Sequence, residues 1–269
     1  MNAALTPKDV LSQLPLWQGA SWHALDGGLS NRTFRLDKEG RSAVLKIDAE
    51  PRRPPYNTRE QEAVVQAVAA KAGLATEVLH VGAGFYLTDY VDGVVWGPAT
   101  FDEDSSLEFL AAALGRLHSL PLSGRLFDAS FAARRYADRV EGNRVLVQTC
   151  IDIIDASPPG RDVRLCHNDL VAENIVSTPG IRFLDWEFAC DNDPLFDLAT
   201  VVEHHGLDRR QARLLLDAYF DGDGTRRLAD LEGRQRFYRA LLWLWLAARA
   251  ATAPAELERV ARSLTTSDS

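Results

Sequence analysis

Residues 165–176 read LCHNDLVAENIV, and the spacing of the polar residues in this stretch decides how the rest of the chain is interpreted. His167, Asp169 and Asn174 follow the pattern H-x-D-x-x-x-x-N between two apolar pairs. Side chains of these types can transfer protons or bind a metal ion. The stretch is therefore either a catalytic loop or a polar turn without a function, and the surrounding sequence has to distinguish the two.

A β-hairpin is expected directly after this loop. The residues on either side of Ser177–Gly180 are strand-forming, and Ser177–Gly180 itself has the composition of a turn. A hairpin with this turn places Asn174 and Asp185 on neighbouring strands near its open end. Amide and carboxylate oxygens are ligands that Mg²⁺ prefers, so we predict a magnesium site at these two residues. Asp169, in the loop that leads into the hairpin, could reach the same place without being a ligand.

The composition limits the classes of protein to which the chain can belong. It has 269 residues, of which 46% are hydrophobic and 25% charged, as in a globular protein with one large domain or two lobes. A net charge of −8 without a lysine or arginine run argues against nucleic acid as a partner and suits a cationic or neutral small substrate. Three cysteines without a C-x-x-C spacing argue against a disulfide framework and a zinc site.

The chain gives no sign of export or of membrane insertion. Its apolar runs stay below the roughly 18 residues that a membrane span needs, and its N-terminus lacks the pattern of an export signal. We therefore expect a cytoplasmic protein, and no feature of the sequence implies a membrane or a protein partner.

The sequence changes character once, near residue 91. Before this point, short β-branched or aromatic runs are separated by glycine-containing turns, and a single helix is expected from about Thr58 to Lys71. After this point, helical patterns dominate apart from the hairpin, including one over about 131–154. We predict an α+β fold in which residues 1–91 form a small antiparallel sheet with one helix, and residues 92–269 form a larger, mainly helical lobe.

Two features of the first lobe suit the binding of phosphate groups. The loop Gly27–Asn31 can lay backbone N–H groups over phosphate oxygens, with Ser30 as a further donor, although a Gly-Gly pair is more often a plain hairpin turn. Lys46 stands alone in the apolar run AVLKI, where it either faces solvent or is held toward phosphates by an acid on the following helix. Glu62 is well placed for that role, and Glu60 is the alternative.

The chain resembles the kinase-type phosphotransferases of the aminoglycoside phosphotransferase and choline/ethanolamine kinase superfamily. The resemblance rests on Glu62 and on the ordered segments GGLSN, AVLKI, YLTDYVDG, HNDLVAEN and LDWE, and it spans roughly residues 22–205. The H-x-D-x-x-x-x-N pattern alone arises by chance in on the order of one chain in a hundred of this length, whereas the ordered set is far rarer. The resemblance implies a bilobal, protein-kinase-like fold with ATP and Mg²⁺ as cofactors.

The resemblance also implies roles for individual residues. Asp169 would act as the catalytic base for the acceptor hydroxyl, and Asn174 and Asp185 would hold Mg²⁺. His167 is then expected to support the loop rather than to do chemistry. The residues implied in ATP binding are Gly28, Ser30 and Asn31 over the nucleotide, Lys46 paired with Glu62 at the phosphates, and Asp89 and Val91 at the adenine.

Departures from the protein-kinase pattern favour a small acceptor. Only eleven residues separate Asp185 from Asp197, which leaves no room for the activation segment that a protein substrate requires. The motif Cys-His-Asn-Asp is similar to the corresponding motif of choline/ethanolamine kinases, and Asp-Trp-Glu is similar to the motif found in both choline and bacterial thiamine kinases. The predicted function is transfer of the γ-phosphoryl group of ATP to the hydroxyl of a small amino alcohol, choline or ethanolamine. A thiamine kinase, an aminoglycoside-type phosphotransferase and a catalytically silent nucleotide-binding module are the alternatives.

A cationic acceptor of this kind is best held by aromatic faces together with carboxylates. Glu187, Glu203 and Trp243 are the candidates for such contacts, although a tryptophan on a helix is more often a core residue. His118, in LGRLHSLPL, is expected to be structural and to close the end of a helix.

Overall fold

The computed structural model describes residues 5–25, 31–49, 52, 54–158, 160, 162–249 and 252–265. The chain forms two compact units. The first unit combines residues 1–96 with residues 173–189, and the second combines residues 97–172 with residues 190–269. The hairpin that follows the Asp169 loop therefore belongs to the first unit, whereas Asp169 itself belongs to the second.

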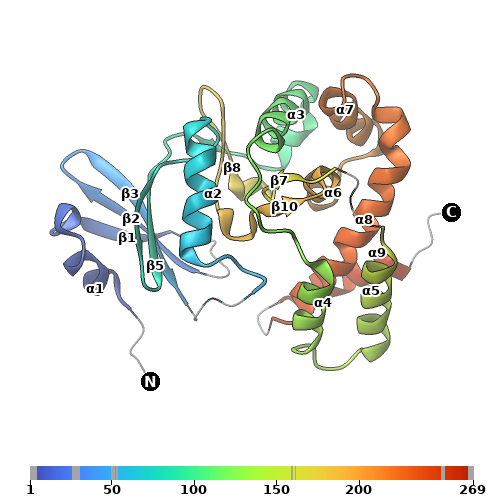
Figure 1. Cartoon of the computed structure of the whole chain (residues 1–269), viewed down its shortest axis with the longest axis horizontal. Coiled ribbons are helices and arrows are strands. Elements are labelled where there is room, and N and C mark those ends of the chain that lie inside the picture. The colour runs from blue at the N-terminus through green and yellow to red at the C-terminus, as the bar shows by residue number, and fades with distance from the viewer. Residues whose placement is uncertain are drawn as a thin grey trace. The chain divides into compact units, whose positions relative to one another are not determined.

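The first unit contains a five-stranded antiparallel sheet with the strand order β1-β2-β3-β5-β4 (Figure 1). Along β3, the alternation of side chains buries Ala43, Leu45 and Ile47 on one face and turns Lys46 to the other. The predicted antiparallel sheet is thus confirmed. Its strands are β1 (Ser21–Leu25), β2 (Asn31–Lys38), β3 (Arg41–Asp48), β4 (Val78–Gly82) and β5 (Phe85–Asp89).

The inward face of β3 packs against the N-terminal segment of the chain. The helix α1 (Pro7–Ser12) and the 3₁₀ turn η1 (Pro15–Trp17) contribute Val10 and Trp17 to a core that includes inward residues of β2, β3 and β5. Burial of this apolar surface stabilises the sheet by roughly 25 cal/mol per Å². The core therefore fixes β3, and with it the position of Lys46 on the opposite face.

A hydrogen bond connects the opposite face of the sheet to the helix α2 (Arg59–Lys71). Tyr86 of β5 lies opposite Lys46 in the register, and its hydroxyl donates a hydrogen bond to Gln66 of α2 at 3.1 Å. The helix begins at a capping box formed by Thr58, whose side chain accepts a hydrogen bond from a backbone N–H of the first turn. The helix predicted from the sequence is therefore confirmed.

The predicted hairpin is also present in the first unit. Leu184 N–H donates to the carbonyl oxygen of Asn174 at 2.8 Å, and this hydrogen bond joins the two strands at the end of the hairpin opposite its turn. A third short strand extends this sheet, whose strand order is β6-β8-β9. The strands are β6 (Val94–Val95), β8 (Ile175–Ser177) and β9 (Ile181–Phe183), followed by the 3₁₀ turn η4 (Trp186–Phe188).

The second unit is mainly helical. The long helix α8 packs against α5, α6, α7 and α9, and α3 packs against α7 (Figure 1). None of the helices in the described ranges has the length and apolar character needed to cross a membrane. The helices are α3 (Asp104–His118), α4 (Ala129–Ala137), α5 (Arg144–Ala156), α6 (Pro194–His205), α7 (Arg209–Tyr219), α8 (Gly224–Ala247) and α9 (Pro254–Thr265), with the 3₁₀ turn η2 (Pro98–Asp102). The 3₁₀ turn η3 (Ala172–Asn174) begins at the last residue of this segment of the second unit and continues into the first unit.

Two features of the second unit differ from the prediction. The single helix expected over about 131–154 is two helices, because Gly142 and Asn143 both adopt positive φ and Asn143 caps the start of α5. A pair of three-residue strands, β7 (Arg164–Cys166) and β10 (Cys190–Asn192), was not predicted. Strands this short show no alternation that the sequence could reveal.

Candidate active site

The first unit brings two of the predicted site residues together as an ion pair. Lys46 Nζ lies 2.8 Å from Asp185 Oδ1. Asp185 lies between β9 and η4, at the N-cap position of η4, and has a left-handed backbone conformation with φ of 60°. Burial acts to lower the pKa of Lys46, but the carboxylates of Asp185 and Glu62 raise it above its ordinary value. Burial acts to raise the pKa of Asp185, but Lys46 holds it below its ordinary value, so both groups are charged at neutral pH.

Glu62 was predicted to pair with Lys46, whereas in this structure the carboxylate of Glu62 forms ion pairs with two arginines. In the described part of the chain, the ion pair of Lys46 is with Asp185, while Glu62 Oε2 accepts a hydrogen bond from Arg59 at 2.8 Å and lies 3.2 Å from Arg52. The two guanidinium groups neutralise Glu62 in place of the lysine. The second carboxylate oxygen, Oε1, is buried without a hydrogen-bond partner among the residues that the structure describes. Glu60, the alternative partner, is exposed.

Arg52 and Arg59 belong to a buried hydrogen-bond network that was not predicted from the sequence. Arg52 Nη2 donates to Glu187 Oε2 at 2.9 Å, Asn31 donates to the same oxygen at 3.1 Å, and Arg59 donates to Asn31 at 2.8 Å. Burial first, and the charge of Asp185 second, raise the pKa of Glu187 to about 7. The Glu187 carboxylate is already paired with Arg52, so this arrangement gives no support to its predicted contact with an acceptor cation.

The remaining predicted residues of the first unit lie at the ends of strands. Asn174 and Asp185 flank the open end of the hairpin, as the sequence predicted. Asp89 ends β5, and its N–H already donates to the carbonyl oxygen of Glu77 at 2.8 Å, so this N–H is not available to a ligand. Asn31 begins β2 and is buried. The predicted loop residues Gly28 and Ser30 lie outside the described residues.

In the second unit, the loop that carries Asp169 is anchored by Asp197 of α6. Asp197 is fully buried, its Oδ2 accepts the His167 N–H at 2.8 Å, and its Oδ1 accepts the Asn168 N–H at 2.7 Å. Hydrogen bonds to a carboxylate are roughly twice as strong as those between neutral groups. The carboxylate therefore fixes the two residues immediately before Asp169. The supporting role expected for His167 agrees with its complete burial.

The Asp169 loop has further supports on both sides. Asn168 has a left-handed backbone with φ of 64°, and its side chain accepts a hydrogen bond from Asn192 at 2.7 Å. On the far side of Asp169, the carbonyl oxygen of Leu170 lies 3.3 Å from His205 Nε2. Asn192 and His205 carry no sequence signal for this role, because the contacts depend on segments brought together by the fold.

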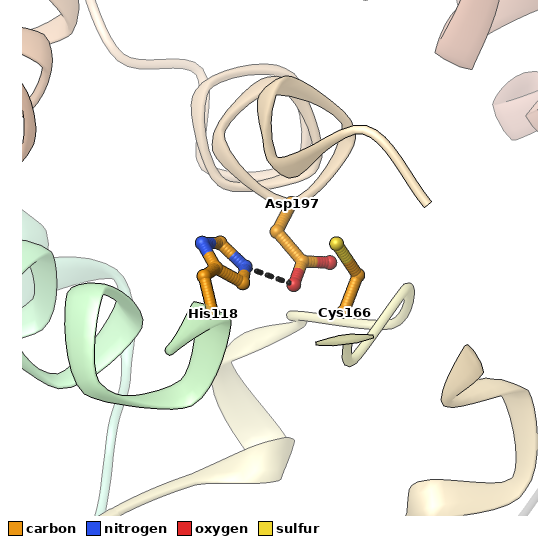
Figure 2. A group of neighbouring side chains, drawn as sticks. All are labelled: His118, Cys166 and Asp197. Atoms are coloured by element: carbon orange, nitrogen blue, oxygen red, sulfur yellow. Dashed lines mark hydrogen bonds and ion pairs between the residues drawn. The ribbon is translucent and has the colours of Figure 1, made fainter. Parts of the chain in front are cut away.

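His118 joins this support through its contact with Asp197. Figure 2 shows the His118 ring directed at the Asp197 carboxylate, with the Cys166 thiol beside it; His118 Nε2 lies 3.0 Å from Asp197 Oδ2. The ligand atoms of these three residues lie within 4.8 Å of one another. Both Asp197 oxygens and both His118 nitrogens are already engaged in hydrogen bonds, so the cluster is a hydrogen-bonding centre rather than a metal site. His118 is the last residue of α3, as its predicted structural role implied.

Two residues that were predicted to contact the acceptor substrate also lie in the second unit. Glu203 of α6 accepts a hydrogen bond from Gln235 at 2.6 Å and lies 3.5 Å from the Arg239 guanidinium. Trp243 of α8 is 4% exposed and packs in the helical core, which favours the structural interpretation of this residue. The Glu203 side chain is 20% exposed, and its contact with an acceptor cation stays a prediction.

Comparison with known proteins complements this geometry. The family model described as "Phosphotransferase enzyme family" matches residues 21–235. Protein LicA of Haemophilus influenzae is 33% identical over 207 residues, in an alignment that covers 72% of this chain and 61% of that protein, and therefore less than two thirds of it. Thiamine kinase of Salmonella typhimurium is 32% identical over 251 residues, in an alignment that covers 90% of this chain and 84% of that enzyme.

A solved structure resembles the chain over nearly its whole length. Choline kinase LicA from Streptococcus pneumoniae superposes with a TM-score of 0.78 at 17% sequence identity, covering 95% of this chain and 97% of the other. At this identity the likeness shows the fold alone. It confirms the predicted protein-kinase-like α+β fold.

Proposed function

Because the chain belongs to the phosphotransferase enzyme family, we propose that it is a kinase that transfers the γ-phosphoryl group of ATP to the hydroxyl of a small, positively charged alcohol. The observation that carries this proposal is the Lys46–Asp185 ion pair at the end of the hairpin that also carries Asn174. A cation that binds phosphates, a carboxylate and an amide oxygen are the groups that phosphoryl transfer requires.

Each of these residues has a defined part in the proposal. Lys46 binds phosphate oxygens of ATP, and Asp169 orients the acceptor hydroxyl and accepts its proton. The hard oxygen donors of Asn174 and Asp185 fit Mg²⁺, and the low pKa of Asp185 keeps it ionised for that purpose. When bound, Mg²⁺ would neutralise the charge of the phosphates. Positioning and electrostatic stabilisation then supply most of the rate enhancement.

The acceptor class is inferred from the relatives and the charge of the chain. Choline or ethanolamine is the acceptor we propose, because the structural neighbour LicA of Streptococcus pneumoniae is a choline kinase and the net charge of −8 suits a cation. Thiamine is the second candidate, because the match to thiamine kinase covers 90% of this chain. Both kinds of acceptor combine a positive charge with a primary hydroxyl.

The proposal is tested by ADP release from Mg·ATP with a panel of choline, ethanolamine, thiamine, an aminoglycoside, a neutral sugar and homoserine. We expect release with choline or ethanolamine; release with thiamine alone selects the second candidate, and release only with a neutral sugar contradicts the cationic class. Mg·ATP should raise the melting temperature, because ligand binding stabilises the folded state. A rise in melting temperature without ADP release on any acceptor would instead indicate a silent nucleotide-binding module.

The Asp169→Ala variant separates catalysis from nucleotide binding in the same assays. It should lose turnover while Mg·ATP still raises its melting temperature, because Asp169 is proposed to act on the acceptor and not on the nucleotide. Near-normal kcat in this variant with an acceptor that the wild-type protein phosphorylates would show that Asp169 is not the base.

A further inference from the structure

Tyr219, the last residue of α7, ends a chain of hydrogen bonds that leads to the Asp169 loop. Its hydroxyl lies 2.7 Å from His118 Nδ1, and His118 Nε2 lies 3.0 Å from Asp197 Oδ2. Asp197 in turn accepts the backbone N–H groups of His167 and Asn168. His118 and Asp197 are 3% and 0% exposed, whereas Tyr219 is half-buried.

The bonding pattern determines which nitrogen of His118 carries the proton. An ionised carboxylate only accepts hydrogen bonds, so the nitrogen that faces Asp197, Nε2, has to be the donor. In a neutral ring, Nδ1 is then an acceptor, and the Tyr219 hydroxyl has to donate to it. Burial raises the pKa of Tyr219 above its ordinary value, which keeps this hydroxyl protonated and able to donate.

We propose that Tyr219 is a positioning residue for the catalytic loop, because its hydroxyl fixes His118 as the Nε2–H tautomer that holds Asp197 against the loop backbone. Without this donor, the buried Nδ1 loses its partner, and the ring can exchange tautomer or rotate. Asp197 then loses a donor, and the two N–H groups before Asp169 are held less firmly. The inference rests on the proposed role of Asp169.

The geometry of the contact allows the hydroxyl to be tested separately from the ring. The rings of Tyr219 and His118 meet edge to face, with centroids 5.5 Å apart and planes at 73°. Phenylalanine at position 219 can keep this packing and removes only the donor. The matched control is Tyr136→Phe, which removes the hydroxyl of a buried tyrosine in α4 that is not one of the residues of this chain of hydrogen bonds.

The experiment compares the kinetics of the full chain and its variants, with Mg·ATP and the acceptor that the wild type phosphorylates in the panel. Tyr219→Phe should lower kcat by about tenfold, the value of one buried hydrogen bond, and leave the KM for ATP within about twofold. Tyr136→Phe should leave both constants unchanged. An unchanged kcat in Tyr219→Phe would overturn the proposal.

The tautomer is followed by ¹H–¹⁵N NMR of the histidine rings, with His118→Gln to assign the His118 signals. The wild type should show a neutral Nε2–H ring at position 118, and Tyr219→Phe should show a mixture of tautomers. An Nδ1–H or doubly protonated ring in the wild type at neutral pH would overturn the proposal. This measurement does not depend on turnover, so it stands even if Asp169→Ala shows that Asp169 is not the base.

A double substitution distinguishes loss of the Tyr219 hydrogen bond from a general packing defect. A glutamine at position 118 can donate to Asp197 through its amide without help from Tyr219. In the His118→Gln background, Tyr219→Phe should therefore cause no further loss of kcat. An equal loss in both backgrounds would show that Tyr219 acts through packing and would overturn its role in fixing the tautomer.

Discussion

At the scale of single residues, the Lys46–Asp185 ion pair predicts a measurable loss of stability when one partner is removed. Lys46→Met leaves a partly buried carboxylate without its cation, which we expect to cost about 1–3 kcal/mol of unfolding free energy. Urea denaturation without nucleotide measures this. The control is Lys71→Met, at the exposed end of α2, which should stay within about 0.5 kcal/mol of the wild type. Equal stability of the two variants would contradict the structural role of the pair.

Asn168 makes a second prediction at this scale, because its backbone is left-handed directly before Asp169. Glycine adopts this conformation freely, whereas alanine pays roughly 1–2 kcal/mol for it. Asn168→Gly loses only the side-chain bonds, including the one to Asn192, whereas Asn168→Ala also strains the loop. We expect kcat to fall further in Asn168→Ala than in Asn168→Gly in the ADP-release assay. The opposite order would show that the side chain, and not the backbone conformation, positions Asp169.

The same scale shows what the sequence can and cannot specify. Residue type and spacing placed Asn174 and Asp185 correctly at the end of one hairpin, because that contact is local. The ion pair of Lys46 in this structure is with Asp185 and not with the predicted Glu62, because Arg52 and Arg59 bind Glu62, and neither arginine stands in a recognisable motif. Asp197 was missed as a support for the loop, because only the fold brings it to His167.

At the scale of secondary-structure elements, long periodic segments were predictable and short ones were not. The helix α2 carries both an apolar stripe and the Thr58 cap, so its bounds were correct to about one residue. The strands β7 and β10 have three residues each and owe their existence to pairing with one another. Gly142 and Asn143 did carry a break signal, and the apolar periodicity on either side of them concealed it.

The capping box of α2 predicts the effect of a substitution on the whole helix. Thr58→Ala removes the side-chain acceptor at the start of α2 and should lower the unfolding free energy by about 1 kcal/mol. Because Arg59 and Glu62 lie in this first turn, the KM for ATP should rise as well if Glu62 takes part in nucleotide binding. Thr58→Ser restores an acceptor and serves as the control. A loss of stability in Thr58→Ser as large as in Thr58→Ala would contradict capping as the cause.

At the scale of the whole molecule, each unit combines segments that are distant in sequence. Residues 173–189 group with the first unit although they follow the Asp169 loop of the second. The predicted division of the chain near residue 91 stays a prediction. It relies on local composition, and composition does not show which distant segment completes a sheet. The polar residues proposed for phosphoryl transfer are correspondingly divided, with Lys46 and Asp185 in the first unit and Asp169 in the second.

The stability of the whole molecule should fall below neutral pH because of His205. Burial first, and the charge of His204 second, lower the pKa of His205 to about 4 from its ordinary value of 6.5. Between these values, the unfolded chain binds a proton that the folded chain does not bind. Stability is therefore present above pH 6.5 and lost as the pH falls toward 4, by up to about 1.4 kcal/mol per pH unit.

A variant that lacks the titratable ring of His205 isolates the contribution of this residue to the pH dependence of stability. His205→Gln keeps a side-chain donor near Leu170 but does not titrate, so between pH 7 and pH 5 it should lose about 2 kcal/mol less unfolding free energy than the wild type. Urea denaturation at the two pH values gives this difference. His80→Gln, at an exposed position in β4, is the matched control and should follow the wild type. Parallel losses in the wild type and His205→Gln would mean that His205 is protonated in the folded protein, and that its stacking on Phe101, with ring centroids 3.7 Å apart, does not exclude the charge.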